Sequence, residues 1–112
     1  MKKDKERIED ILEAIDRIER YFLKGREAFD ADELIQIWMT HHIQTIGEAA
    51  SRLSRELRDH HPDIPWSAII GMRNILVHDY FGVDLEEVWS TVEKDIPQLK
   101  NEMTIILEEQ AD

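Results

Sequence analysis

The chain has no cysteine among its 112 residues, which excludes disulfide bonds, thiol catalysis and zinc bound by cysteine. This absence is compatible with the cytoplasmic location that we expect. Long apolar runs are also missing: none approaches the roughly 20 residues that cross a bilayer, and residues 1–6 lead into an amphipathic pattern rather than an apolar signal segment. Glycine and proline are scarce, at four and three residues. We therefore expect a helical protein with no membrane association.

Positive charge is in short supply as well. The chain has 14 lysines and arginines against 25 acidic residues, a formal net charge of −11, which argues against nucleic acid wrapping its whole surface. The charge is uneven, because residues 52–78 carry four arginines against three carboxylates, whereas residues 79–112 carry two lysines against ten carboxylates. The middle of the chain is therefore the only stretch that favours a phosphate. The acidic C-terminal third is either a solvated helix face or a surface for a basic protein partner.

Apolar residues recur at intervals of three and four, the spacing of an amphipathic helix. The first such stripe predicts a helix that ends near Gly25, and its members are Ile8, Ile11, Leu12, Ile15, Ile18 and Phe22. Asp30 and Glu33 have the form of a capping box, so we expect a second helix to begin there and to continue to about residue 60. Small residues inside it indicate either the close approach of another helix or simply a tolerated glycine. They are Gly47, Ala49 and Ala50.

Prolines at positions 62 and 65 end the second helix, and a third is predicted over residues 66–81. It is apolar nearly all round, which favours a place in the middle of a bundle or at a subunit interface. Asp84 with Glu87 predicts the cap of a fourth helix, and Pro97 is expected to separate it from a last helix. The sequence therefore predicts one all-α domain over residues 1–112, an up-and-down bundle of four to five helices.

Four polar residues interrupt the apolar second half of the third helix: Arg73, Asn74, His78 and Asp79. A guanidinium in an apolar helix must be paired or must have a function, because burying an unpaired charge is costly. Two structural alternatives stay open: Arg73 pairs with Asp79 or with a carboxylate of a neighbouring helix, and His78 simply lies near a helix C-terminus. Seven residues return to the same helix face, so Tyr80 lies under Arg73, but His78 is offset from Arg73 by roughly 140°. The spacing favours a composite site between two subunits.

Residues 71–80 read GMRNILVHDY: an arginine, four residues, a histidine, one residue and a tyrosine. This run resembles the signature of the HEPN superfamily (higher eukaryotes and prokaryotes nucleotide-binding) and, within it, of the HepT-type toxins. The similarity is strongest over residues 43–93. Its flanking matches are residues 46–50, 62–66 and 83–85, together with Trp89.

The resemblance implies a HEPN-like bundle that dimerises through the motif-bearing helix. It implies a metal-independent endoribonuclease, the toxin of a type VII-like toxin–antitoxin pair, encoded beside a nucleotidyltransferase antitoxin called MNT. The antitoxin would silence the toxin by transferring AMP to Tyr80. The expected partners are RNA, a second copy of the chain and the antitoxin, and the size of any larger assembly with the antitoxin stays open. No cofactor and no metal are expected.

The residue types fit this chemistry. His78 titrates near neutrality and is expected to act as general base or acid, while Arg73 stays protonated and would clamp the phosphate. Asn74 would support the site and Asp79 would orient an imidazole. Tyr80 would stack on a base or accept AMP; alternatively, it is an aromatic residue that closes a core helix.

Other candidates are weaker. The adjacent pairs His41-His42 and His60-His61 lack the spacing of metal ligands. The arginines at positions 52, 55 and 58 step by three along the predicted second helix and form either an RNA-binding stripe or a solvated face. The tryptophans at positions 38, 66 and 89 fall on apolar stripes and are expected in the core. The alternative function is a catalytically silent HEPN module that binds a nucleotide or regulates a nucleotidyltransferase.

Overall fold

The computed structural model of the chain describes residues 3–74 and 84–110, and in these residues every regular element is helical. The elements are α1 (Asp4–Phe22), α2 (Gly25–Ala31), α3 (Glu33–Ser51), α4 (Arg55–His60), α5 (Trp66–Gly71), the 3₁₀ turn η1 (Met72–Asn74), α6 (Leu85–Ser90), the π-helical turn η2 (Thr91–Asp95) and α7 (Ile96–Glu109). The all-α prediction is confirmed. No helix within the described ranges is long and apolar enough to cross a membrane.

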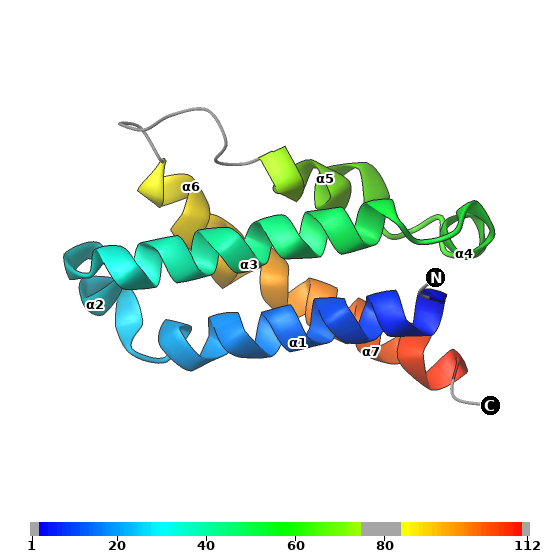
Figure 1. Ribbon diagram of the computed structural model, residues 1–112, viewed down its shortest axis with the longest axis horizontal. Helices are drawn as coiled ribbons and strands as arrows, with labels where there is room; N and C mark the ends of the chain where they lie inside the picture. Colours follow the sequence, from blue (N-terminus) through cyan, green and yellow to red (C-terminus); the bar gives the residue numbers. More distant parts are fainter. Residues whose placement is uncertain (1–2, 75–83, 111–112) are drawn as a thin grey trace.

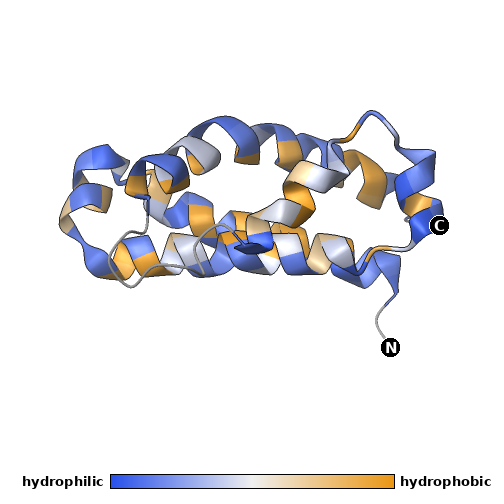
Figure 2. Cartoon of the chain, turned by 90° about the horizontal axis from the view of Figure 1, so that it is seen from above, coloured by the Kyte–Doolittle hydropathy of each residue, from blue (hydrophilic) through white to orange (hydrophobic). Residues whose placement is uncertain are grey.

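The two longest helices, α1 and α3, lie side by side and antiparallel, with α2 at the turn between them (Figure 1). Helix α7 packs on α1, while α5 and η1 pack on α3. The apolar stripe predicted for the first helix lines this interior: Ile8, Ile11, Ile15 and Ile18 are fully buried. Figure 2 shows apolar residues on the sides of the helices that face one another and hydrophilic residues outside. Burial of this stripe is what holds the bundle together.

The second helix begins two residues later than its predicted capping box. Asp30 lies inside the short helix α2, where its carboxylate accepts a hydrogen bond of 2.8 Å from Arg26 Nε. The cap of α3 is Asp32, whose carboxylate accepts the backbone N–H of Leu34 at 2.9 Å. The prediction chose the wrong aspartate because two carboxylates lie within three residues, and α2 was not expected.

The second helix also ends earlier than predicted, at Ser51 rather than near residue 60. A separate helix, α4, follows, and Ser54 caps it by accepting the Leu57 N–H at 3.1 Å. The Ser54 backbone and hydroxyl in turn donate to the Asp4 carboxylate at 2.9 and 2.6 Å, which ties this break to the start of α1. The prediction of an arginine stripe along one helix is therefore wrong: Arg52 ends α3, whereas the arginines at 55 and 58 lie on α4.

The helices after the motif differ from expectation at one point. Asp84 caps α6 by accepting the Glu87 N–H at 3.1 Å, as predicted. Pro97, however, does not separate two helices, because α6 continues through η2 directly into α7, with Pro97 in the first turn of α7. A proline removes one backbone donor and crowds the preceding turn, and the wider π-helical turn before it accommodates both effects.

The predicted third helix is described only as far as Asn74. Its described part, α5 with η1, buries one face through Ile69 and Met72 rather than being buried all round. Residues 75–83 lie outside the described ranges, so the predicted continuation to residue 81 is not described.

Candidate functional site

The structure places two of the five predicted site residues. Arg73 and Asn74 are the last residues of η1, the turn that follows α5 and packs on α3, and both are exposed. His78, Asp79 and Tyr80 lie outside the described residues. The site can therefore be built from its arginine and the elements that hold it.

Gly47 sets the distance between η1 and α3. A Cβ atom on Gly47 would lie 2.3 Å from the backbone nitrogen of Arg73 and 2.9 Å from its Cα, closer than real contacts allow. Only glycine permits this approach, since any side chain would push the η1 backbone away. The prediction that small residues of the second helix mark a close helix contact is confirmed, and the alternative of a merely tolerated glycine is wrong.

The neighbouring residue, Glu48, faces the arginine side chain. Glu48 Oε2 lies 3.8 Å from Arg73 Nη1, while Glu48 Oε1 accepts a hydrogen bond of 3.0 Å from Arg52 Nε. One structural alternative for Arg73, a carboxylate on a neighbouring helix, is thus observed. The pair is long, and 43% of the Arg73 side chain remains exposed. Such an exposed pair contributes little to stability, and it leaves the guanidinium accessible to a phosphate.

Asn74, the other described site residue, lines a groove of about 440 Å³ between α5 and the α6–α7 helices. Three carboxylates line this groove as well, those of Glu87, Asp95 and Glu102. Partial burial raises the pKa of Glu102 above its ordinary value. Because like charges repel, a phosphate is disfavoured there. Arg73 is not part of the described lining of this groove.

The other polar candidates are mostly engaged in local contacts. Besides the Arg52–Glu48 pair, Arg55 Nε lies 3.8 Å from Asp59, so these two arginines form the ion-paired, solvated surface that was the alternative to RNA binding. His61 Nε2 lies 3.4 Å from Glu109. In the described part of the chain, no group of three or more histidine, aspartate or glutamate side chains is placed to hold a metal ion.

The three tryptophans serve the bundle. Trp38 Nε1 donates to the Arg17 carbonyl at 2.9 Å, and Trp66 Nε1 donates to the His61 carbonyl at 3.0 Å. Trp89 is buried, with its ring centroid 5.0 Å from that of Phe22. Trp89 is a core residue as predicted, and Trp66 is half-buried against the core. Trp38 is half-buried beside the rings of Tyr21 and His42 rather than in the core.

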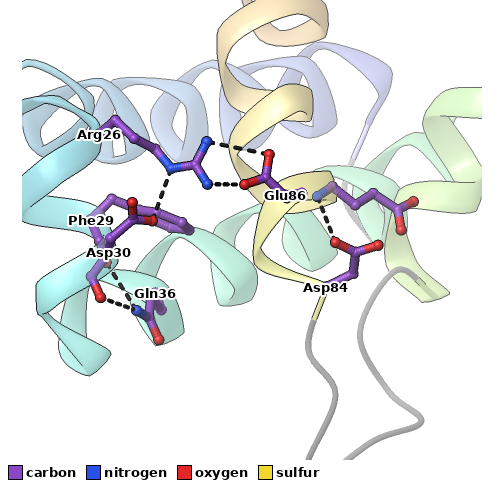
Figure 3. Close-up of polar contacts among 7 residues, drawn as sticks. Arg26, Phe29, Asp30, Gln36, Asp84 and Glu86 are labelled. Atoms are coloured by element: carbon purple, nitrogen blue, oxygen red, sulfur yellow. Dashed lines mark hydrogen bonds and ion pairs between the residues drawn. The ribbon is translucent and has the colours of Figure 1, made fainter.

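Sequence reasoning missed the contact that holds the first turn of α6. Arg26 on α2 binds both Asp30 and Glu86, and its guanidinium lies 5.7 Å from the centre of the Trp89 ring (Figure 3). The hydrogen bonds to the two carboxylates raise the pKa of Arg26 further above its ordinary value. Asp84, at which the described residues resume after the motif (residues 71–80), lies beside this cluster. The cluster therefore joins α2 to the first turn of α6.

The fold and these residues define a class: an all-α bundle that presents an accessible arginine on a short turn seated against a glycine of a long helix. The family model described as "Ribonuclease HepT-like" matches residues 11–106. The chain therefore belongs to the HepT-like ribonuclease family, and the resemblance drawn from residues 71–80 is confirmed.

Curated relatives agree with this assignment. The chain is 40% identical over 97 residues to the "Probable ribonuclease HepT" of Thermococcus cleftensis, with 86% of this chain and 88% of that protein covered. It is 37% identical over 78 residues to the "Putative RNase MJ1380" of Methanocaldococcus jannaschii, covering 70% and 72%.

A third relative is longer. The chain is 43% identical over 100 residues to the "Gamma-glutamylcyclotransferase and putative RNase MJ0434" of Methanocaldococcus jannaschii, covering 88% of this chain but only 45% of that protein. This chain thus spans about half the length of that relative. No solved structure matches the chain significantly.

Proposed function

We propose that this chain is the toxin of a type VII-like toxin–antitoxin pair and that it cleaves RNA without a metal ion. The observation that carries the proposal is the accessible guanidinium of Arg73, held on η1 by its contact with Gly47, in a member of the HepT-like family. A permanently protonated guanidinium is suited to bind phosphoryl oxygens and to stabilise the charge that develops on them.

The site is completed by a second subunit. Arg73 lies on the surface rather than in a closed pocket, and His78 follows five residues later in the chain. If the helix continues, that spacing turns His78 about 140° away from Arg73. In a two-fold homodimer with the motif segments facing, each guanidinium meets the imidazole of the partner subunit across one cleft.

The reaction is a transfer within the RNA strand. His78 removes the proton of the ribose 2′-hydroxyl, the 2′-oxygen bonds to phosphorus, and the bond from phosphorus to the 5′-oxygen breaks. A water molecule gives the leaving 5′-oxygen its proton, and the hydroxide that remains is neutralised by the proton that His78 took up. The products are a 2′,3′-cyclic phosphate and a 5′-hydroxyl. Arg73 stabilises the phosphoryl oxygens during the transfer, Asn74 adds a polar contact and Asp79 orients an imidazole.

Inhibition would act on the same cleft. An MNT-type nucleotidyltransferase transfers AMP to the Tyr80 hydroxyl, releasing pyrophosphate from ATP. The attached nucleotide adds negative charge beside Arg73 and occupies the space of the RNA. Intact-protein mass after coexpression with an MNT-type nucleotidyltransferase tests this step, because Tyr80→Phe should abolish the added AMP.

The ribonuclease proposal is tested with unmodified protein, single-stranded RNA and a chelator. We expect cleavage to persist in the chelator, to fall by roughly 10²–10⁴-fold in His78→Ala and by roughly 10²–10³-fold in Arg73→Ala. His60→Ala, an exposed histidine on α4, is the matched control and should cleave normally. Cleavage that needs a metal, or that survives His78→Ala, would overturn the mechanism.

A second candidate rests on the Arg73–Glu48 pair, which partly neutralises the guanidinium inside its own chain. In this case the chain is a catalytically silent HEPN module that binds a nucleotide or regulates a nucleotidyltransferase. It would bind the transferase but leave RNA intact in the same assay, with or without His78.

A further inference from the structure

A second groove, of about 510 Å³, lies between α1 and α3 and reaches Glu48, the residue that also contacts Arg73. Nine of its eleven lining residues are polar or charged, the exceptions being Ala14 and Ala49, while carbon atoms supply the larger part of the accessible lining. Such a lining suits a ligand with both polar groups and an apolar body.

Unpartnered nitrogens gather in this groove. In the described residues, four buried side-chain nitrogens have no hydrogen-bond partner, and three of them belong to groove residues: Nε of Arg7 and both ring nitrogens of His42. Buried polar groups almost always have partners, so their concentration at one place calls for an explanation. His42 is only 7% exposed and packs edge-on against the Trp38 ring, with centroids 4.5 Å apart.

The protonation state of His42 limits what it can bind. Burial lowers the pKa of His42, and the nearby positive charge of His41 and Arg17 lowers it further against the opposing effect of Glu13. At neutral pH the ring therefore offers one donor and one acceptor, as a nucleobase edge requires, rather than a cation. No three metal-binding side chains come together in the described portion, so a metal ion is a poor candidate.

The groove is less acidic than the chain as a whole. Its lining holds two guanidiniums, those of Arg7 and Arg17, against three carboxylates, whereas the whole chain carries −11. Glu13 contacts Arg17, and Glu48 contacts Arg52 and lies 3.8 Å from Arg73.

We propose that the α1–α3 groove holds one nucleotide of the RNA strand next to the cleaved bond, with its phosphate on Arg7 and its base edge on His42. The proposal rests on the proposed ribonuclease function and adds a subsite to it. A nucleotide carries both a phosphate, which Arg7 can bind, and a base edge that matches the donor and the acceptor of the His42 ring. The groove volume suits a ligand of that size. Because the groove ends at Glu48, a strand held there continues toward Arg73.

The test uses a 2′-O-methyl single-stranded RNA, which cannot be cleaved, and measures its Kd by fluorescence anisotropy at several salt concentrations. Arg7→Gln and His42→Leu should each weaken binding by about tenfold, the loss of one good hydrogen bond. Arg7→Gln should also reduce the slope of log Kd against log salt by about 0.7, because one phosphate contact is lost. The controls Arg20→Gln, on the exposed face of α1, and His60→Leu should bind like the original protein.

The outcomes separate this proposal from the nuclease itself. If RNA is cleaved but both groove variants bind it normally, the subsite is wrong and the ribonuclease stands. If RNA binds through Arg7 and His42 but is not cleaved, the groove stands and the ribonuclease falls. An effect of His42→Leu alone would make His42 a packing residue and overturn the subsite. Displacement of the RNA by equimolar free AMP would make the groove a mononucleotide site and overturn it too.

Discussion

The backbone of Arg73 lies directly against Gly47, the one position near this contact where α3 carries no side chain. This contact seats the arginine of the motif on the long helix of the bundle, and the next residue of that helix, Glu48, faces its guanidinium. Backbone packing thus sets the position of Arg73, the residue expected to bind phosphate. Its side chain stays partly exposed and can contact a substrate.

Two glycine substitutions distinguish the effect of this contact on stability from the effect of helix propensity. Gly47→Ala should destabilise the protein by about 1–3 kcal/mol, because the new methyl group overlaps the Arg73 backbone. Gly71→Ala is the matched control: a Cβ atom there would meet no described atom within 4 Å, and alanine should stabilise the helix by about 0.5–1 kcal/mol. Urea unfolding measures both. A harmless Gly47→Ala would mean that η1 does not rest on α3 in solution.

Glu48 should compete with RNA for Arg73. Glu48→Gln removes the negative charge 3.8 Å from the guanidinium, so the KM for RNA should fall up to about fivefold, in keeping with an exposed ion pair. Stability should change by less than about 0.5 kcal/mol, since both partners are exposed. Glu56→Gln, which removes an exposed carboxylate from α4, is the control. An equal fall of KM in both variants would show a general charge effect rather than a specific pair.

Features that depend on neighbours in the chain could be predicted from the sequence. The Asp84 cap and the buried stripe of α1 follow from local spacing, and the motif around Arg73 identified the family. The predicted cap of α3 was wrong because Asp30 and Asp32 are both suitable N-cap residues. Asp30 is part of α2, and Asp32 is the residue that caps α3. For the contact of Gly47 with Arg73, the sequence predicted only that small residues of a long helix mark the close approach of another helix.

Features that join distant residues could not be predicted. Arg26 and Glu86 are 60 residues apart, and nothing in either local pattern indicates that they meet. The same holds for the histidine pair on α3: His42 is buried and His41 exposed because of how α3 rests on α1. Ser54, just after the break at Ser51, hydrogen-bonds Asp4, which is 50 residues earlier in the chain.

The buried imidazole predicts a loss of stability in acid. Because the pKa of His42 is lowered in the folded state, the unfolded chain binds its proton more readily, and stability should fall as the pH drops below about 6.5. The raised pKa of Glu102 acts in the opposite direction in more acidic solution. His42→Leu should remove the first effect and, by eliminating two unpartnered nitrogens, should keep stability near or above the original at neutral pH.

The measurement is the urea midpoint at about pH 7.5 and about pH 5.5, on either side of the ordinary histidine pKa. Glu102 is common to both proteins, so the difference between His42→Leu and the original chain isolates the imidazole. His60→Leu, with an exposed ring, serves as the control. Equal pH dependence with and without His42 would show that the folded chain binds the His42 proton as readily as the unfolded chain does.

The Arg26 cluster should hold the start of α6 without holding the bundle as a whole. Arg26→Ala removes the bonds to Asp30 and Glu86 and the contact with the Trp89 ring. Hydrogen exchange should then become faster in the first turn of α6, while the amides of α1 and α3, buried in the core, keep their protection. Arg20→Ala, which breaks an exposed pair with Asp16 inside α1, should leave α6 unchanged. Because α6 follows the motif (residues 71–80) in the chain, we also expect Arg26→Ala to slow RNA cleavage. Normal cleavage by a variant in which α6 exchanges faster would show that the motif does not depend on the Arg26 cluster.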